Sequence, residues 1–336
     1  MLYVNLQARC CDSVGGVILK TANKAQGSQS FSYKLHLRKK QITRNWQLYL
    51  FILPAILIII LFYYVPIYGV QIAFRDYNAF SGGISGSPWV GWANFERFFN
   101  SYYFKDLLVN TLVLSFYQLI VGFIIPIILA LLLTQLESRR FKRFAQNVIY
   151  APYFISAVVI VGMLSVFFSP SGGLVNVVRT GLGAEAVDYM AQPEYFRHMY
   201  VWSGVWQTAG WGTVIYIAAL SGVNPELYEA ATVDGCNKLQ RMFYVDIPCI
   251  IPTMVTVLIL NTGSIMNIGF EKVYLMQSSL NLPVSEVIST YVYKIGILST
   301  DYSLATTIGL FNSVVNCVLL LVVNTISRHV SENSLW

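Results

Sequence analysis

Six long apolar stretches constrain this chain more than any other feature of its sequence. No Asp, Glu, Lys or Arg lies inside any of them. Each is long enough for a helix to cross the hydrocarbon core of a bilayer, which takes about 20 apolar residues. The sequence therefore predicts an all-α integral membrane protein with six transmembrane helices, at residues 46–74, 107–136, 148–168, 200–222, 247–270 and 303–326.

The scarcity of charge supports the same class. Charged residues make up 11% of the 336 residues, whereas an average soluble domain carries about 25%. A chain so poor in charge cannot cover a water-facing surface, which excludes a cytosolic enzyme and a nucleic-acid binder with a basic face. The net charge of +6 suits orientation in a membrane and does not by itself imply nucleic acid.

The charges between the stretches predict the orientation. Alternate loops, counted from the N-terminus, hold 15 of the 22 Lys and Arg but only 7 of the 16 Asp and Glu, a net charge of +8. The remaining loops hold 7 basic and 9 acidic residues, a net charge of −2. Because cytoplasmic loops carry an excess of Lys and Arg, both termini are expected in the cytoplasm. The predicted parts are a cytoplasmic extension at 1–45, a six-span domain at 46–328 with a cytoplasmic loop at 223–246, and a tail at 329–336.

That cytoplasmic loop contains strong local signals. Asn224 is a good N-cap and Pro225 a good first helical residue, and acids in the first turns complement the helix dipole. Asp234-Gly235 is expected to end this helix, because glycine adopts the left-handed turn readily. A second short helix follows up to Tyr244, before Pro248 and Pro252 open the fifth span. The loop therefore predicts a pair of helices in the cytoplasm.

The same loop resembles the EAA loop of ABC-importer permeases. The matching positions are Glu229, Ala230, Ala231, Asp234 and Gly235, followed by Pro248. Cys236 and Met242 stand where that family usually has Ala and Phe. Segment 90–95, with Asn110-Thr111, is similar to the outer-loop signature of sugar-importer permeases. Segments 269–274, 287–293 and 309–313 are similar to the branch that imports oligosaccharides and polysaccharide fragments, including alginate and pectin-type saccharides.

The resemblance implies a type I ABC importer permease in a prokaryotic cell membrane. Its first loop helix would dock on an ATPase subunit, where Glu229 would meet a basic group. The implied partners are a homologous second permease, two ATP-binding subunits carrying ATP and magnesium, an extracellular solute-binding lipoprotein, the saccharide and membrane lipid. This chain has no Gly-x-x-x-x-Gly-Lys-Ser/Thr loop and no Cys/His metal spacing. We therefore expect no catalytic residue, metal or cofactor in it.

Polar and aromatic residues in the spans are candidates for the substrate path, since polar groups in a membrane are costly unless they face a cavity or a neighbouring helix. Hydrogen bonds between helices would explain each of them equally well. If the saccharide is acidic, a basic group near the outer mouth, Arg75, Arg97 or Lys272, would receive it. The candidates are Tyr117, Gln118, Tyr153, Trp206, Gln207, Asn261, Ser264, Asn267, Asn312 and Asn316, and Asn261, Ser264 and Asn267 are expected to share one helix face.

Two other functions compete with an ATP-driven importer. A secondary transporter driven by an ion gradient commonly places ionisable residues at the bilayer midplane, and the six spans have none. A membrane enzyme would need a catalytic cluster, but the three histidines form no His-Glu-x-x-His motif. The saccharide importer is therefore the leading hypothesis.

Overall fold

The computed structural model describes residues 45–78, 80 and 82–330, and these residues form helices but no β-strand. An isolated antiparallel bridge joins Arg75 and Trp89. The chain divides into two compact units, residues 1–69 and 70–336. Most of the extension expected at 1–45 and most of the tail expected at 329–336 lie outside the described residues.

The described part of the first unit is one apolar helical run. It consists of α3 (Trp46–Ile59), η1 (Ile60–Tyr64) and the start of η2 (Val65–Phe74). No residue of α3 is buried within the chain, although the helix is almost wholly apolar. A helix that is hydrophobic all round needs lipid or other protein around it, as expected for the first span.

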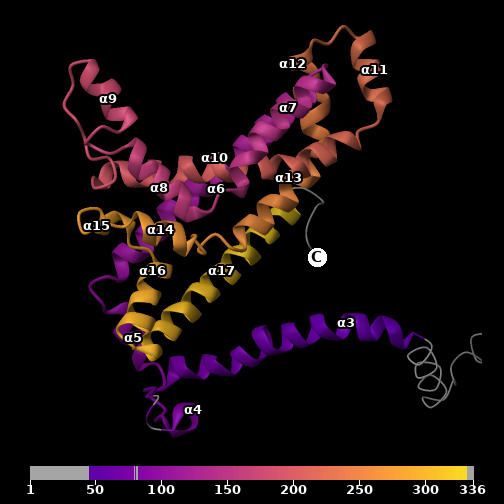
Figure 1. Ribbon diagram of the computed structural model, residues 1–336. Helices are drawn as coiled ribbons and strands as arrows, with labels where there is room; N and C mark the ends of the chain where they lie inside the picture. The colour runs from indigo at the N-terminus through magenta and orange to yellow at the C-terminus, as the bar shows by residue number, and fades with distance from the viewer. Residues whose placement is uncertain (1–44, 79, 81, 331–336) are drawn as a thin grey trace, which may run out of the picture. The chain divides into compact units, whose positions relative to one another are not determined.

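The second unit holds the remaining helices, which Figure 1 shows in chain order. Their bounds are α4 (Gly83–Gly86), α5 (Ala93–Phe99), α6 (Phe104–Thr134), α7 (Arg139–Tyr150), η4 (Ala151–Phe154), α8 (Ala157–Phe167), α9 (Leu174–Gly181), α10 (Pro193–Ser221), α11 (Pro225–Val233), α12 (Lys238–Arg241), η5 (Met242–Asp246), α13 (Ile247–Thr262), α14 (Phe270–Met276), α15 (Leu282–Ser285), α16 (Ile288–Tyr293), η6 (Lys294–Leu298) and α17 (Tyr302–Val330).

Four helical runs among the described residues are long and apolar enough to cross a membrane: Trp46–Phe74, Phe104–Thr134, Lys238–Thr262 and Tyr302–Arg328. A fifth span results if Arg139–Phe154 and Ala157–Phe167, which meet at a bend of 98°, are one crossing. The stretch expected to be the fourth span lies in α10, which has 29 residues. Polar side chains such as Gln207, Thr208 and Thr213 lower its mean hydropathy, and it is not one of the four helical runs that are apolar enough to be counted.

The third predicted span was wrong as a single continuous helix. The chain breaks at Ile155 and Ser156, whose backbones are extended. Ser156 caps the new helix, with its hydroxyl accepting a hydrogen bond from the Val159 N–H at 3.4 Å. Pro152 stands in the 3-10 turn before the break. An apolar run does not reveal such a break, because its cause is a cap and a turn.

The fifth predicted span also differs from the structure. The helix expected at 247–270 ends at Thr262, and residues 263–269 form turns and irregular backbone before α14. Ser264 and Asn267 therefore do not continue the helix face of Asn261. At the other end, η5 and α12 continue α13 into the loop expected in the cytoplasm, so that the expected separate second helix is the beginning of this span.

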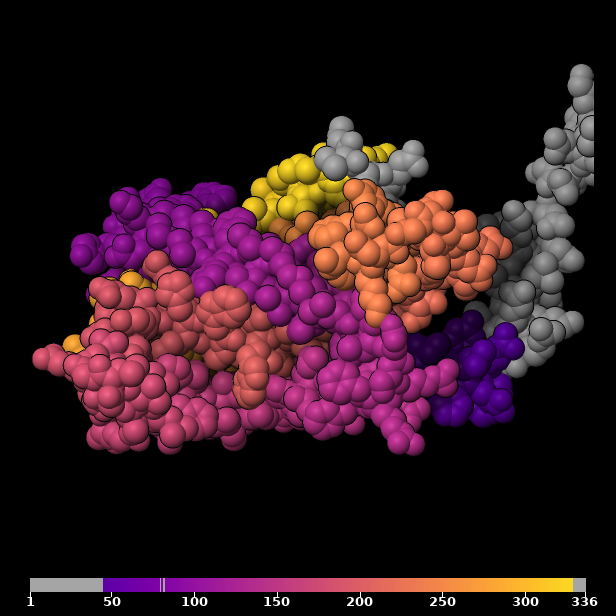
Figure 2. Space-filling view, turned by 90° about the horizontal axis from the view of Figure 1, so that it is seen from above, coloured from indigo at the N-terminus to yellow at the C-terminus, as the bar shows by residue number. Residues whose placement is uncertain are grey.

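Helix α10 is the centre of the second unit. It packs along α6, and two apolar clusters, around Leu114 and Ile127, follow this contact. A third cluster, around Ile265, joins α5 and α6 to α16 and α17. Figures 1 and 2 show the α9 segment and the segment that begins with α11 at opposite ends of the unit. The fold thus places the short loop helix α9 and the predicted coupling loop far apart, joined by α10.

Gly210 lets α7 approach α10 closely. A Cβ atom at this position would lie 2.0 Å from the carbonyl oxygen of Ile149, which is backbone and cannot rotate away. We therefore expect Gly210→Ala to destabilise the protein by at least the cost of overpacking, about 1–3 kcal/mol. The measurement is the thermal unfolding temperature of the purified protein in detergent. Gly162→Ala in α8 is the matched control, because a Cβ there meets nothing within 4 Å; equal melting temperatures for the two variants would contradict this packing.

Candidate functional site

Helix α11 forms as its sequence predicts. The Asn224 side chain accepts a hydrogen bond from the Glu226 N–H at 3.1 Å, and Pro225 follows as the first residue. At the other end Gly235 has φ +74°. The Cys236 N–H donates to the Ala231 carbonyl and the Gly235 N–H to that of Thr232, which is the Schellman arrangement. The cap and the turn together fix a helix of nine residues.

The predicted coupling residues differ in how exposed they are. Glu229 and Ala230 are exposed, and no ion pair among the described residues involves Glu229. Ala231 instead is 7% exposed and packs inside the chain. Of the two alanines, only Ala230 therefore contributes a small side chain to the exposed face of α11, where Leu227 is also exposed. Asp234 and Gly235 form the end of the helix.

A buried carboxylate holds α11 to the membrane helices. Asp246, which is 1% exposed, accepts a hydrogen bond from the Tyr228 hydroxyl at 2.7 Å and one from the Gln135 amide at 3.0 Å. Arg241 donates to Gln135 at 2.6 Å, and its guanidinium lies 5.2 Å from the centroid of the Tyr228 ring. This group, Gln135, Tyr228, Arg241 and Asp246, is here called the root of α11. It connects α11 to the end of α6 and the beginning of α13.

Little in the sequence indicates this root. Asp246 reads as one more loop acid, and its partners lie 18 and 111 residues away. Burial, and then the hydrogen bond to Asp246, raise the pKa of Tyr228 well above its usual range, so that its hydroxyl remains a donor. Nearby, Lys238 pairs with Glu137 at the surface and holds the pKa of that carboxyl below its usual value.

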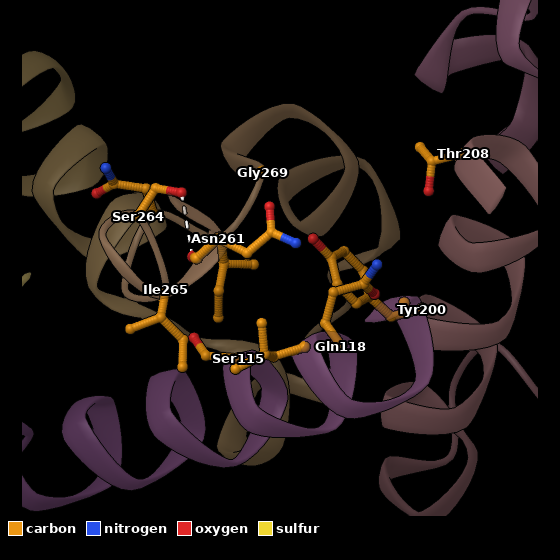
Figure 3. A pocket seen from close by; sticks show the side chains of 12 residues that line it. Ser115, Gln118, Tyr200, Thr208, Asn261, Ser264, Ile265 and Gly269 are labelled. Atoms are coloured by element: carbon orange, nitrogen blue, oxygen red, sulfur yellow. Dashed lines mark hydrogen bonds between the residues drawn. The ribbon is translucent and has the colours of Figure 1, made fainter. Parts of the chain in front are cut away.

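A polar cavity of about 350 Å³ lies in the other half of the unit. Figure 3 shows Ser115 and Gln118 projecting from α6, with Tyr200 beside them and the chain from Ser264 to Gly269 opposite. Thr208 and Asn261 complete the polar lining. The buried oxygens of Ser115 and Gln118 have no hydrogen-bond partner among the residues that the structure describes. A buried polar atom without a partner is costly, so this cavity suits a polar guest.

The comparisons with known proteins agree with this geometry. Residues 122–332 match the family described as the inner membrane component of binding-protein-dependent transport systems. This chain belongs to that family. The match includes α11, the root and most of the cavity, and it gives no support to an ion-gradient-driven transporter.

Two relatives from Bacillus subtilis (strain 168) are similar over most of the permease. The polygalacturonan/rhamnogalacturonan transport system permease protein YteP is 38% identical over 95% of this chain and 100% of its own length. Protein LplB is 40% identical over 88% of this chain and 92% of its own. A chain from the crystal structure of a bacterial alginate ABC transporter, in complex with an alginate pentasaccharide-bound periplasmic protein, aligns with a TM-score of 0.81 at 36% identity, covering 88% of this permease and 99% of that chain. The fold is therefore that of a type I ABC importer permease.

The structure brings four of the predicted substrate-path residues together. Gln118, Asn261, Ser264 and Asn267 all line the polar cavity. Tyr200, Ser115 and Thr208 line it as well, although none of them was a predicted candidate. Their burial depends on how α6 and α10 pack, which single residues do not reveal.

The other six candidates lie elsewhere or are engaged in structure. Gln207 donates to the Ile155 carbonyl at the break before α8. Asn312 and Asn316 donate to the Asn267 side chain at 3.0 and 3.2 Å. Outside the polar cavity, Tyr117 bonds His198 and Trp202, Tyr153 stacks on Trp211, and Trp206 lines a separate apolar cavity.

Of the three outer basic groups, one is buried beside the cavity. Lys272 is 8% exposed; its ammonium donates to the Tyr200 carbonyl at 3.1 Å and lies 5.1 Å from the centroid of the Tyr200 ring. Burial lowers the pKa of Lys272 to about 8, so the group is mostly protonated at neutral pH. Arg97 instead pairs with Asp301 at 2.8 Å, and Arg75 donates to the Ser87 carbonyl and lies over Trp89.

Tyr228→Phe tests the root of α11. The variant leaves Asp246 buried with one donor fewer, and a hydrogen bond to a charged group contributes about 1.5–3 kcal/mol. We expect a lower unfolding temperature and faster hydrogen exchange at the amides of α11, measured by mass spectrometry. Tyr244→Phe is the control, because Tyr244 is 76% exposed. Unchanged exchange in α11 of the Tyr228 variant would refute the anchoring role.

Proposed function

We propose that this permease is a membrane-spanning subunit of an ATP-driven importer that translocates oligosaccharides or polysaccharide fragments delivered by an extracellular binding protein. It would work with a homologous second permease and with two ATP-binding subunits. The observation that carries the proposal is the exposed helix α11 with Glu229 free of internal ion pairs, while the other side of the helix is held by a buried root. Such a helix offers a surface to a partner and is fixed to the spans.

The root gives this helix a mechanical connection. ATP-driven closure of the partner subunits would move α11, and Tyr228 and Asp246 would carry that motion to α6 and α13. These two helices provide Ser115, Gln118 and Asn261 to the polar cavity. Movement at the cytoplasmic end would therefore change the walls of the substrate path. ATP and magnesium would be bound by the partner, and no chemical step is assigned to this chain.

The cavity supports a saccharide as the cargo. Sugars present hydroxyl groups that bond amides and hydroxyls, and apolar faces that pack on aromatic rings. Gln118, Asn261, Ser264 and Thr208 offer the hydrogen-bonding contacts in one place. YteP is named for transport of polygalacturonan and rhamnogalacturonan, and the similar crystal structure is of an alginate transporter. Both names support a saccharide as the substrate of this permease.

Glu229→Arg is the test of docking. In the complex reconstituted with its partners, we expect coupled ATP hydrolysis and saccharide uptake to fall by more than about tenfold, because reversing a charge in an interface places like charges together. Glu226→Arg is a control on the same helix, and we expect it to lose about twofold or less, since Glu226 lies in the first turn, where its carboxylate accepts an exposed hydrogen bond from the Asn224 amide. Wild-type hydrolysis and uptake by the Glu229 variant would remove the docking proposal.

The proposed orientation places both termini in the cytoplasm, with α9 outside and α11 inside. Val233 and Leu182 are 88% and 83% exposed and mark these two sides. With the five native cysteines replaced by serine, a membrane-impermeant maleimide added to intact cells should label Leu182→Cys. It should label Val233→Cys only after the membrane is opened. The reverse pattern would invert the topology.

A further inference from the structure

We propose that Lys272 and Gln118 form an anion subsite at the edge of the polar cavity, which receives the carboxylate of a uronic acid residue in the translocated saccharide. This inference rests on the proposed function and assigns its substrate class. It also assigns to Lys272, which sequence analysis offered as one of three basic groups, the role of selecting an acidic sugar.

Lys272 is a buried cation that has only neutral partners. Among the described residues, none of the three ion pairs includes it, and its ammonium contacts the carbonyl and the ring of Tyr200. Burying a charge without a counter-charge is strongly unfavourable. A carbonyl and a ring offset only part of that cost, so the position favours an anion that comes from outside the chain.

The side chain of Gln118 lies close to the ammonium of Lys272. A Cβ atom built on Gly204 would lie 3.3 Å from the ammonium of Lys272 and 3.3 Å from the side-chain oxygen of Gln118. The two groups are therefore separated by no more than twice that distance, and the absence of a side chain at Gly204 lets both of them approach this position. Gln118 lines the cavity, and its buried oxygen has no hydrogen-bond partner in the described part of the chain. Rotated about its last bond, the same amide presents an N–H donor.

Four of the other basic residues expected on the outer side are engaged elsewhere. Arg97 and Lys294 are paired with Asp301 and Glu286 at 2.8 and 2.6 Å. Arg75 and Arg197 donate to Ser87 and Asn110, neither of which lines the polar cavity. Lys272 also donates to a neutral group, but its acceptor, Tyr200, is part of the cavity wall.

The donor set fits a carboxylate on a sugar. One ammonium and one amide offer one positive charge and separate donors for the two oxygens of a monoanion. A sugar phosphate would bring up to two negative charges against a single cation. Next to the subsite, Tyr200, Thr208 and Asn261 remain for the ring and its hydroxyls. A uronic acid residue combines these two kinds of group within one sugar.

The test is equilibrium binding to the complete transporter complex in nanodiscs, without the binding protein, so that the preference measured belongs to the membrane subunits. The probes are trigalacturonate and its trimethyl ester, which has a similar size and no charge. We expect the wild-type complex to prefer the acid. Lys272→Gln should weaken binding of the acid by about tenfold, the scale of a charge-assisted hydrogen bond, and leave binding of the ester within about twofold.

Three further variants make the result specific. Lys272→Arg keeps the charge and should restore the preference, whereas Gln118→Glu provides an internal carboxylate for Lys272 and should weaken binding of the acid as Lys272→Gln does. Lys105→Gln removes an exposed lysine at the start of α6 and should change neither affinity. Ester binding by each variant shows that it is folded.

Failure of the subsite and failure of the proposed function give different results. If the wild-type complex binds acid and ester equally, or if Lys272→Gln and Lys105→Gln behave alike, the subsite is wrong and the saccharide importer stands. Tighter binding of galactose 1-phosphate than of trigalacturonate would overturn the uronate assignment. If the wild-type complex neither binds nor imports any saccharide, the proposed function fails, and the subsite with it.

Discussion

The need to satisfy backbone hydrogen bonds away from water controls this structure. In lipid, an N–H or carbonyl group without a partner is costly, so a spanning helix is interrupted only where another group replaces its lost hydrogen bonds. Both interruptions described here have that replacement. The Ile155 carbonyl at the break before α8 accepts from Gln207, and the Met266 N–H in the irregular segment after α13 donates to Asn316 at 2.9 Å.

This constraint explains why the substrate path could be predicted only in part. An amide that supports a broken helix and an amide that faces a sugar have the same residue type and the same apolar sequence around them. Gln207 and Asn316 belong to the first kind, whereas Gln118 and Asn261 line the polar cavity that is proposed to receive the sugar. Telling them apart requires the positions of the helix breaks. Those breaks are formed by caps and turns and supported by tertiary contacts such as the Gln207 amide on the Ile155 carbonyl, and the apolar composition of a run does not show them.

Local features were predicted far better. Asn224, Pro225 and Gly235 fix the bounds of α11 through neighbours a few residues away, so the sequence alone was sufficient. Most of the apolar stretches likewise became long helices, because their length and composition are local properties. The root of α11 was missed, since Asp246 becomes a buried acceptor only when Gln135, 111 residues away, packs against it.

The two polar sites share the same two helices. On α6, Gln118 at the cavity and Gln135 at the root are 17 positions apart in the sequence, about 25 Å along a helix at 1.5 Å per residue. On the other helical run, Asn261 and Asp246 are separated by 15 positions, roughly 22 Å. Each run contains a proline between its two sites, Pro126 in α6 and Pro252 in α13. Because a proline removes one backbone hydrogen bond and favours a kink, each helix has a defined place to bend. A displacement of α11 that reaches both helices through Asp246 would then open or close the angle between their cavity ends, which changes the shape of the cavity without unfolding either span.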